Sequence, residues 1–514
     1  MHDVVIVGAG PVGLFLACEL GLAGCSVLVL EQEPVPESPW RTEPLGLRGL
    51  FGSSLAAFHR RDLLDELMEA SFDFDGRRDV GVGADSDANT DLTDGPSRPR
   101  MVGHFAGMML DAARLDTAAF PFRSTGPVPD IAMISLQALE SLLTRRAVKL
   151  GVEVRRGVTV DALAQHEEHA VVSAGGTGFE ARWVVGCDGG RSAVRRLAGF
   201  AFTGTEPEVT GYTVLGTLAD PDGLRPGFNL TPTGMYVRMP LAGHIAMLDF
   251  DGGAFDRTRQ PTLDHLQTVL RRISGTDATF TEVRMASSFT DRAKQATTYR
   301  KGRVLLAGDA AHIHSPLGGQ GLNTGIGDAV NLGWKLAATA RGHAPEGLLD
   351  TYDRERRPIG AQVLDWSRAQ VAVMRPDRHA HAIQNVVRDL LGTRDGTTYV
   401  FGRLSGASLR YDLGDTHPLV GRNAPDFLLG EGTRLGELMR NGRGVVLDFS
   451  ADRRLGGPAA AWRDRLEHVS GTPAEDFGLG AVLVRPDGVV AWAADRDFTV
   501  PGFDRAAARW FGRP

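Results

Sequence analysis

The first thirteen residues constrain the fold more than any other part of the chain. A run of aliphatic residues over 4–7 leads directly into Gly-x-Gly-x-x-Gly, which spans Gly8 to Gly13. In a strand–turn–helix unit, the first glycine permits a tight turn, the second lets the backbone approach a pyrophosphate, and the third lets the helix pack closely. A second aliphatic run over 27–30 ends at Glu31, where an acidic residue binds a ribose hydroxyl. Together these features predict a dinucleotide-binding unit.

A distant stretch of the sequence indicates which dinucleotide is bound. The apolar run over 304–307 ends in Gly308-Asp309, and a glycine-rich segment over 316–323 follows before a helix that we expect to start near Gly321. The aspartate is suited to accept hydrogen bonds from a polyol chain, and the glycines let backbone amides approach a flat polar ring. The positive end of the helix would stabilise negative charge on a reduced flavin. The two stretches together predict FAD.

A third stretch supports the same ligand. Asp188 and Gly189 follow a predicted buried strand, and Ser192 is placed to cap a short helix that carries Arg195. His312 and His314 flank the glycine-rich segment, and we expect them to hold it by hydrogen bonds. They need no catalytic role, because in flavin chemistry the cofactor performs the difficult step.

Composition and charge exclude several classes of protein. The length of 514 residues suits about three domains, and the formal net charge of −7 disfavours nucleic acid as a partner. No apolar run reaches the roughly 18 residues of a membrane span, and from the start of the first strand at residue 3 or 4 we expect no signal peptide. The three cysteines, Cys18, Cys25 and Cys187, have no metal-binding spacing, so we expect no metal and a reduced, cytoplasmic setting.

The pattern along the chain is α/β, with a split Rossmann-like unit and a middle region whose alternating runs predict an antiparallel sheet. Residues 75–100 have no periodicity, and we interpret them as a surface insertion that is either a lid or disordered. The other expected elements are helices over 53–70, 134–150, 328–341, 348–370 and 379–391, and strands over 101–108, 151–154, 157–160, 170–173, 183–188, 444–449 and 481–484.

The three motifs resemble, in order and spacing over residues 1–390, those of the FAD-dependent aromatic hydroxylases, a family of single-component flavoprotein monooxygenases. The stretches 310–323, 331–336, 417–422 and 484–488 are most similar to the subgroup that oxygenates polycyclic aromatic polyketides of the angucycline, anthracycline and tetracycline type. The resemblance implies reduction by NAD(P)H, with NADPH favoured, and dioxygen as the second substrate. It also implies a thioredoxin-like C-terminal domain, which here lacks a cysteine pair and is therefore assigned a structural role.

From this we expect a discontinuous FAD-binding domain over 1–73, 128–198 and 285–395. A substrate-binding domain is expected over 74–127 and 199–284, and the thioredoxin-like domain over 396–514. The residues, together with the resemblance, predict that the cofactor is bound by Gly8, Gly10, Val12, Gly13, Glu31, Gln32, Arg41, Gln137, Val160, Asp188, Gly189, Ser192, Arg195, Asp309, Pro316, Gly319, Gly321, Leu322 and Asn323.

The chain also departs from the family pattern. Ser53 stands where the subgroup usually has an arginine that contacts the flavin, Leu136 where it usually has glutamine, and Trp366 where it often has asparagine. We assign no catalytic side chain, and we expect Arg48 and Trp366 to modulate the substrate or the flavin.

The predicted reaction is hydroxylation of a polycyclic aromatic polyketide in secondary metabolism. A Baeyer–Villiger or ring-rearranging oxygenation and a flavin-binding protein that does not oxygenate remain alternatives. Both a monomer and a homodimer remain open.

Overall fold

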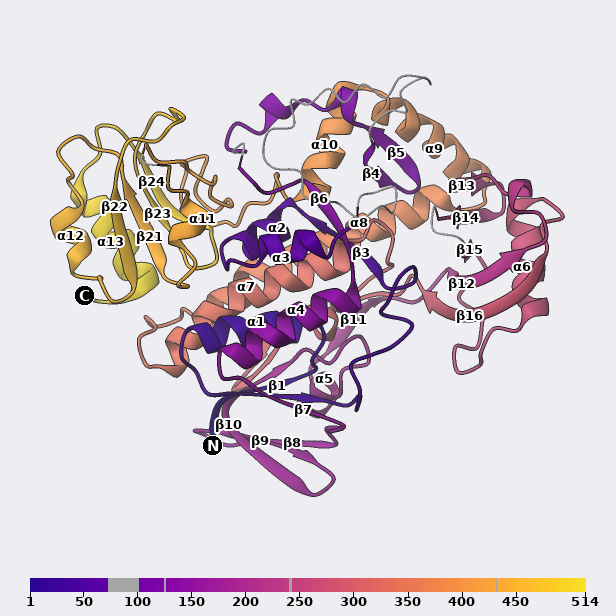
Figure 1. Ribbon diagram of the computed structural model, residues 1–514, viewed down its shortest axis with the longest axis horizontal. Coiled ribbons are helices and arrows are strands. Elements are labelled where there is room, and N and C mark those ends of the chain that lie inside the picture. The colour runs from indigo at the N-terminus through magenta and orange to yellow at the C-terminus, as the bar shows by residue number, and fades with distance from the viewer. Residues whose placement is uncertain (73–100, 124–125, 240–242, 431) are drawn as a thin grey trace.

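The computed structural model describes residues 1–72, 101–123, 126–239, 243–430 and 432–514. Figure 1 shows three sheet-containing regions: the N-terminal parallel sheet at the bottom, an antiparallel sheet at the right, and the C-terminal sheet at the left. Long helices in the centre connect them. Within the described residues, no helix combines the length and the apolar character needed to cross a membrane.

The parallel sheet carries the glycine motif. Its strands run in the order β18-β19-β10-β1-β2-β7, and β1 pairs in parallel with both β2 and β10. Val4, Val5 and Ile6 of β1 are fully buried, as expected for a parallel sheet covered on both faces. The strands are β1 (His2–Val7), β2 (Val27–Glu31), β7 (Glu153–Arg156), β8 (Ala162–Gln165), β9 (Ala170–Ala174), β10 (Thr177–Gly186), β18 (Arg300–Lys301) and β19 (Val304–Leu306).

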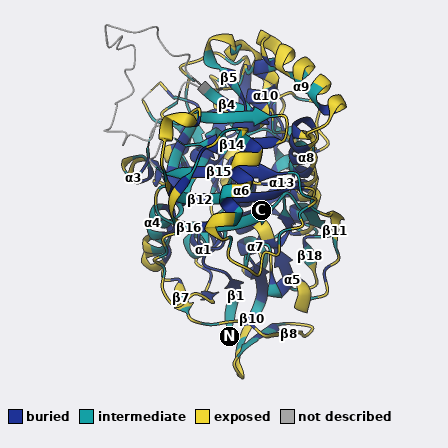
Figure 2. Ribbon diagram, turned by 90° about the vertical axis from the view of Figure 1, so that its right-hand side faces the viewer, coloured by how far each residue is buried: buried dark blue, intermediate teal, exposed yellow. Residues whose placement is uncertain are grey.

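Three helices form the layer on this sheet, namely α1 (Pro11–Leu22), α4 (Leu136–Lys149) and α7 (Gln320–Ala340). Helix α1 lies between the other two and is almost wholly apolar, which explains its burial against both neighbours. Figure 2 shows that burial varies across the sheet, since the outer strands β7 and β8 are partly exposed, and that α9 (Arg378–Leu391) exposes much of its surface.

The middle region forms an antiparallel sheet in the order β13-β14-β15-β12-β16. One face packs under α6 (Leu263–Ser274), where Tyr212, Met247 and Leu270 are fully buried. The opposite face turns toward Leu317 and helix α8. The strands are β12 (Thr210–Leu218), β13 (Gly227–Thr231), β14 (Gly234–Arg238), β15 (His244–Asp249) and β16 (Phe280–Thr290).

The C-terminal region has the strand order β22-β21-β23-β24, with β21 parallel to β22 and antiparallel to β23. This is a thioredoxin-like arrangement, and the cysteines of the chain all lie outside it. Its elements are α11 (Leu435–Leu438), β21 (Gly444–Asp448), α12 (Gly456–Ala460), β22 (Leu466–Ser470), β23 (Leu479–Val484), β24 (Val490–Asp495) and α13 (Val500–Phe511).

Smaller elements join these regions. They are β3 (Leu47–Phe51), α2 (Gly52–His59), α3 (Leu64–Glu69), β4 (Met101–Phe105), β5 (Met108–Asp111), β6 (Ile131–Ser135), α5 (Ala193–Leu197), β11 (Phe202–Thr205), β17 (Ala293–Ala296), β20 (His312–Ile313), α8 (Asp350–Met374), α9 (Arg378–Leu391) and α10 (Arg394–Ser405), with short 3₁₀ turns at Ala112–Arg114, Thr117–Ala119, Pro221–Gly223 and Gly308–Ala310.

Several predicted elements differ from the structure. The single helix expected over 53–70 is two helices, α2 and α3, because the chain turns at Asp62, whose φ is 59°. The strand expected over 101–108 is the β4–β5 hairpin, which turns at Ala106 and Gly107.

Other expectations concern single elements. The prediction of a strand over 157–160 was wrong, because those residues form no strand. Helix α4 starts at Leu136 because the preceding strand β6 pairs with β3, and one helix, α7, begins at Gln320 rather than near Asp328. The insertion predicted over 75–100 lies outside the described residues.

The expected boundary between the second and third domains, after residue 395, falls inside α10. Val400 and Leu404 of this helix pack in the cluster that contains the middle sheet. We therefore propose that the C-terminal domain begins beyond α10.

Candidate active site

The glycine turn between β1 and α1 is closely packed on one side and open on the other. A Cβ atom at Gly8, whose φ is +107°, would lie 2.4 Å from the carbonyl oxygen of Cys187. A Cβ at Gly13 would lie 2.0 Å from the carbonyl oxygen of Gly8, whereas a Cβ at Gly10 would have no neighbour within 4 Å. No side chain of the described residues caps the N-terminus of α1, so its first-turn amides are available to an anion.

The side chain of Glu31 stabilises this turn by hydrogen bonds. Its carboxylate accepts hydrogen bonds from the backbone nitrogens of Ala9, at 2.7 Å, and Glu33, at 2.9 Å. An ionised carboxylate has about four lone-pair sites, so Glu31 retains acceptor capacity for a ribose. Gln32 beside it is exposed, and Val160 is buried in the core next to the sheet.

A group of charged and polar side chains lies near Glu31. Arg41 pairs with Glu140 at 3.1 Å, and burial raises the pKa of Glu140 to about 7 although Arg41 and Arg156 oppose the shift. Gln137 has a buried side-chain oxygen, and Arg156 a buried guanidinium nitrogen, without a hydrogen-bond partner among the described residues. Buried polar groups normally have partners, so these two fit a polar ligand. Arg156 was missed by the sequence reasoning, because an arginine near the end of a strand carries no motif.

The Gly308-Asp309 segment meets the glycine turn through Val12. The side chain of Val12 packs against two glycines of this region. A Cβ atom added at Gly308 would lie 3.1 Å from Cγ2 of Val12, and one added at Gly325 would lie 2.5 Å from the same atom. Asp309 is exposed, and no hydrogen bond or ion pair occupies its carboxylate within the described ranges. Its oxygens are therefore free to accept hydrogen bonds from a polyol.

The segment 316–323 leads into the open N-terminus of α7. Gly319 adopts a left-handed conformation as the N-cap, and no side chain caps the helix. The backbone nitrogen of Gly319 donates to the carbonyl of the exposed Pro316, and Gly321 lies close to His314. The amides of Gly321 and Leu322, which is partly exposed, thus face outward with the positive end of the helix dipole.

The Asn323 side chain already has protein partners. It accepts a hydrogen bond from the nitrogen of Phe51 at 2.9 Å and donates to the carbonyl of Gly49 at 2.9 Å. It therefore ties α7 to strand β3, and only its backbone is left for a ligand.

The stretch around Asp188 contacts residues 308–323, which are called the flavin segment below. The Asp188 carboxylate accepts from the Ser192 hydroxyl at 2.5 Å and from the Ala193 nitrogen at 2.6 Å, and so caps α5. Arg195 donates to the carbonyl of Ala310 at 3.0 Å and stacks over a phenylalanine ring. Gly189, with a φ of +75°, makes the turn between strand and cap.

His312 holds the same segment, as expected. Its Nε2 lies 2.7 Å from Asp328, whose carboxylate also accepts from Gly308 and from Arg356. His312 and Asp328 are fully buried, and Arg356 holds the pKa of Asp328 below its usual value against the effect of burial. His314 contacts the carbonyl of Ser315 at 2.7 Å.

The middle sheet presents a half-buried apolar face to this segment. Phe289, which lies over Gly211, belongs to the cluster that includes Leu317. Trp366 packs edge-on against Phe105, with ring centroids 4.8 Å apart. The other partly buried members of this face are Phe228, Leu230, Met239, Ala246 and Phe250.

Polar groups stand at one edge of the same face. His244 on β15 lies 3.0 Å from the hydroxyl of Thr213, and its Nδ1 is buried without a partner in the described part of the chain. Burial and the nearby Arg48 lower the pKa of His244 to about 4, so its imidazole is neutral at physiological pH. Arg48 itself donates to the carbonyls of Leu45 and Leu47.

The residues present fit FAD on three structural observations. Two helices with uncapped N-termini lie at separate positions along the site, an unpaired aspartate stands between them, and Gln137 and Arg156 are buried without partners. The fold and the site therefore define an FAD-binding flavoprotein.

Comparison with known proteins identifies the family of flavoproteins to which the chain belongs. Residues 1–367 match the family model described as FAD binding domain, and residues 417–514 match the model described as aromatic-ring hydroxylase, C-terminal. A monooxygenase from Claviceps purpurea is 42% identical, with 100% of this chain and 98% of the relative covered. The chain belongs to the family of FAD-dependent aromatic hydroxylases, which are flavin-dependent monooxygenases.

Solved structures of similar proteins support the same family assignment. The OxyS anhydrotetracycline hydroxylase from Streptomyces rimosus superimposes with a TM-score of 0.84 at 35% identity, covering 100% of this chain and 99% of that one. The Diels-Alderase PyrE3 of pyrroindomycin biosynthesis superimposes with a TM-score of 0.81 at 32% identity, covering 100% of both chains. The same scaffold is therefore described both as a hydroxylase and as a Diels-Alderase.

Proposed function

We propose that this protein uses NAD(P)H, with NADPH favoured, and dioxygen to insert one oxygen atom into a polycyclic aromatic polyketide. The proposed outcome is hydroxylation with the ring system intact. The observation that carries the proposal is the half-buried apolar face of the middle sheet, which joins the flavin segment through Leu317. A planar aromatic molecule placed there would be covered by apolar side chains on the sheet side.

The chain's own groups have defined tasks in this reaction. Bound FAD supplies the redox chemistry and the activation of dioxygen. The N-terminus of α7, which no described side chain caps, would stabilise negative charge that develops on bound FAD. Leu317, Phe289 and Trp366 exclude water from the substrate and orient its plane.

The edge with Arg48 and His244 favours a second outcome. Arg48 is a cation near a neutral His244, and a cation at this edge would assist attack on a carbonyl group by stabilising negative charge. A Baeyer–Villiger or ring-rearranging oxygenation therefore remains the second candidate.

Labelled dioxygen distinguishes the two. Holoenzyme, NADPH and a panel of anthracycline, angucycline and tetracycline aglycones are incubated under ¹⁸O₂, and the products are resolved by mass spectrometry and NMR. We expect one labelled oxygen in a new phenol or tertiary alcohol. Label in a lactone or in a rearranged ring would instead establish the second candidate.

The resemblance to a Diels-Alderase adds a control. If the protein binds FAD but converts a polyene substrate without consuming NADPH or dioxygen, it does not act as an oxygenase. Parallel measurement of NADPH oxidation and oxygen uptake with each substrate decides this point.

A further inference from the structure

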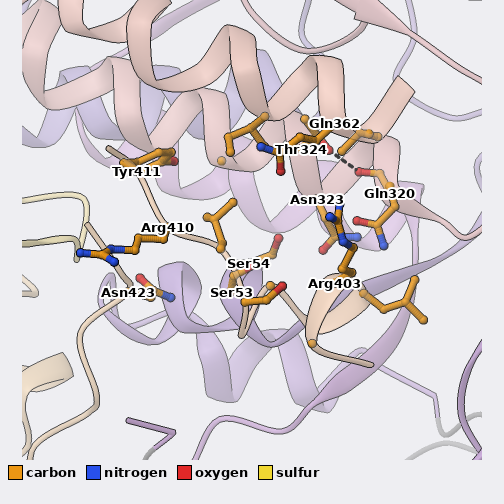
Figure 3. A pocket seen from close by; sticks show the side chains of 18 of the residues that line it. Ser53, Ser54, Gln320, Asn323, Thr324, Gln362, Arg403, Arg410, Tyr411 and Asn423 are labelled. Atoms are coloured by element: carbon orange, nitrogen blue, oxygen red, sulfur yellow. Dashed lines mark hydrogen bonds between the residues drawn. The ribbon is translucent and has the colours of Figure 1, made fainter. Parts of the chain in front are cut away.

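A cavity of about 630 Å³ lies beside the flavin segment and shares Trp366 with the substrate face described above. Helices α2, α7, α8 and α10 form its walls, and residues 408–411 together with Gly421 and Asn423 close it on the side of the C-terminal domain. Its inner end includes Gln320 and Asn323, in the first turn of α7 (Figure 3). A ligand in this cavity would therefore reach the helix end that faces the flavin ring.

Small side chains on α2 make the room. Ser53, Ser54 and Ala57 line the floor of the cavity, where larger residues would fill it. The Ser54 hydroxyl is buried and has no hydrogen-bond partner among the described residues, and the same holds for Nε1 of Trp366. Two unsatisfied polar atoms in the lining indicate a ligand with polar groups of its own.

The charge of the lining favours an anion. Arg403 lies over the rings of Trp366 and Tyr399, at 5.6 Å and 5.4 Å from their centroids. It makes no ion pair or hydrogen bond within the described ranges, and Figure 3 places its guanidinium beside Asn323 and Gln320. Arg403 is exposed and has no carboxylate partner among the described residues, so its guanidinium is accessible to a phosphate or carboxylate.

The other charged groups of the lining do not neutralise the positive charge of Arg403. Arg60 is buried, and its side chain donates to the backbone carbonyl of Asp487 as its one hydrogen bond within the described residues. The Asp487 side chain is paired with Arg485, and Asp116 is paired with an exposed arginine of α10. Asp395 alone among the acids of the lining has no ion pair in the described part of the chain.

We propose that this cavity binds the nicotinamide dinucleotide that reduces the flavin, with Arg403 pairing with its diphosphate. The inference rests on the proposed function. The pattern Gly-x-Gly-x-x-Gly occurs once in the chain, at the turn assigned to FAD, so a second dinucleotide needs a site of another kind. The apolar face of the middle sheet is assigned to the aromatic substrate, which leaves the cationic cavity at the flavin segment for the reductant.

The test measures anaerobic flavin reduction by stopped-flow absorbance over a range of NADPH concentrations. Arg403→Gln should raise the apparent Kd for NADPH at least tenfold, while FAD content and reduction by dithionite stay at wild-type values. Arg403→Lys should recover part of the affinity. Arg388→Gln, which removes an exposed arginine of α9 outside the cavity, is the matched control and should behave as wild type.

A steric variant gives independent evidence. Val363 lines the cavity and is partly exposed, so Val363→Trp should fill the space and raise the Kd for NADPH without loss of FAD. Wild-type NADPH affinity in both Arg403→Gln and Val363→Trp would overturn the cavity proposal alone. Weaker binding of the aromatic substrate with unchanged NADPH affinity would assign the cavity to the substrate and overturn it as well. A wild-type protein that neither NADPH nor NADH reduces would refute the proposed function together with this site.

Discussion

The buried charge cluster that docks the C-terminal domain offers the sharpest test of the architecture. Arg485 is fully buried and forms two hydrogen bonds with Glu355 of α8, at 2.9 and 2.8 Å, and two with Asp487, at 2.5 and 3.1 Å. Lys335 of α7 contributes a further contact to Glu355 at 2.9 Å. The cluster thus joins the turn after β23 to the two long helices that adjoin the flavin segment.

Arg485→Met removes one partner and leaves carboxylates in a dry interface. Breaking a buried ion pair in this way costs about 3–5 kcal/mol. Lys335 still neutralises part of Glu355, so we expect a loss near the lower end, about 3 kcal/mol, in the free energy of unfolding of the C-terminal domain. A double-mutant cycle with Glu355→Gln should give a coupling energy within the roughly 0.5–3 kcal/mol seen for residues in direct contact.

Denaturant titration of the holoenzyme, followed by two probes, measures the effect. The tryptophan fluorescence includes Trp510 and Trp334, whose ring centroids lie 4.5 and 5.5 Å from the Arg485 guanidinium, and flavin fluorescence reports on FAD release. The tryptophan transition should shift to lower denaturant before FAD is released. Arg496→Met, which breaks an exposed pair with Asp476, is the control and should leave the midpoint of the tryptophan transition close to that of wild type. Equal losses in the two variants would refute the view that buried charges hold the domain in place.

Three further changes test the FAD site. Asp309→Ala should weaken FAD binding by about 1.5–3 kcal/mol, measured by titration of the apoprotein, and unchanged affinity would contradict the polyol assignment. Glu31→Ala should lower FAD affinity and also loosen the glycine turn, because the backbone nitrogens of Ala9 and Glu33 lose their acceptor. Faster proteolysis of the apoprotein near residue 9 would report the loosened turn. Unchanged proteolysis would argue that Glu31 only binds the ribose. The raised pKa of Glu140, about 7 against an ordinary 4.5, means that the fold takes up a proton between these values, so wild-type stability falls as pH rises through that window. Glu140→Gln should therefore be more stable than wild type at pH 8, with a difference that vanishes near pH 4.5, and a constant difference across this range would contradict the assigned shift.

Local chemistry accounts for the parts that the sequence predicted well. Gly8 and Gly13 are required by backbone contacts within a single strand–turn–helix unit, and the consequence of such contacts is visible in a short stretch of sequence. The same is true of the alternating runs that form the antiparallel middle sheet and of the glycines that open the N-terminus of α7. The family resemblance rests on these local patterns, and the comparisons confirmed it.

Distant segments decide the side-chain partners of residues that the sequence predicts as cofactor ligands. The side chain of Asn323 binds strand β3, which is more than 270 residues away in the chain, so its predicted contact with the flavin would be made by its backbone. Asp188 matches a cofactor motif, yet its carboxylate caps α5. The β4–β5 hairpin was mistaken for one strand because its turn is made by Ala106, a residue that rarely adopts a positive φ.

The sequence by itself therefore determined the class of fold, the FAD-binding motifs and the family, because each depends on residues that are neighbours in the chain. Tertiary structure alone decided that Arg403 of α10 stands beside the first turn of α7 and that Arg485 lies between two carboxylates. A lone arginine has the same local pattern whether it is solvated or buried. Its role is set by which carboxylates, rings and carbonyls the folded chain brings to it, and that information is spread over segments hundreds of residues apart.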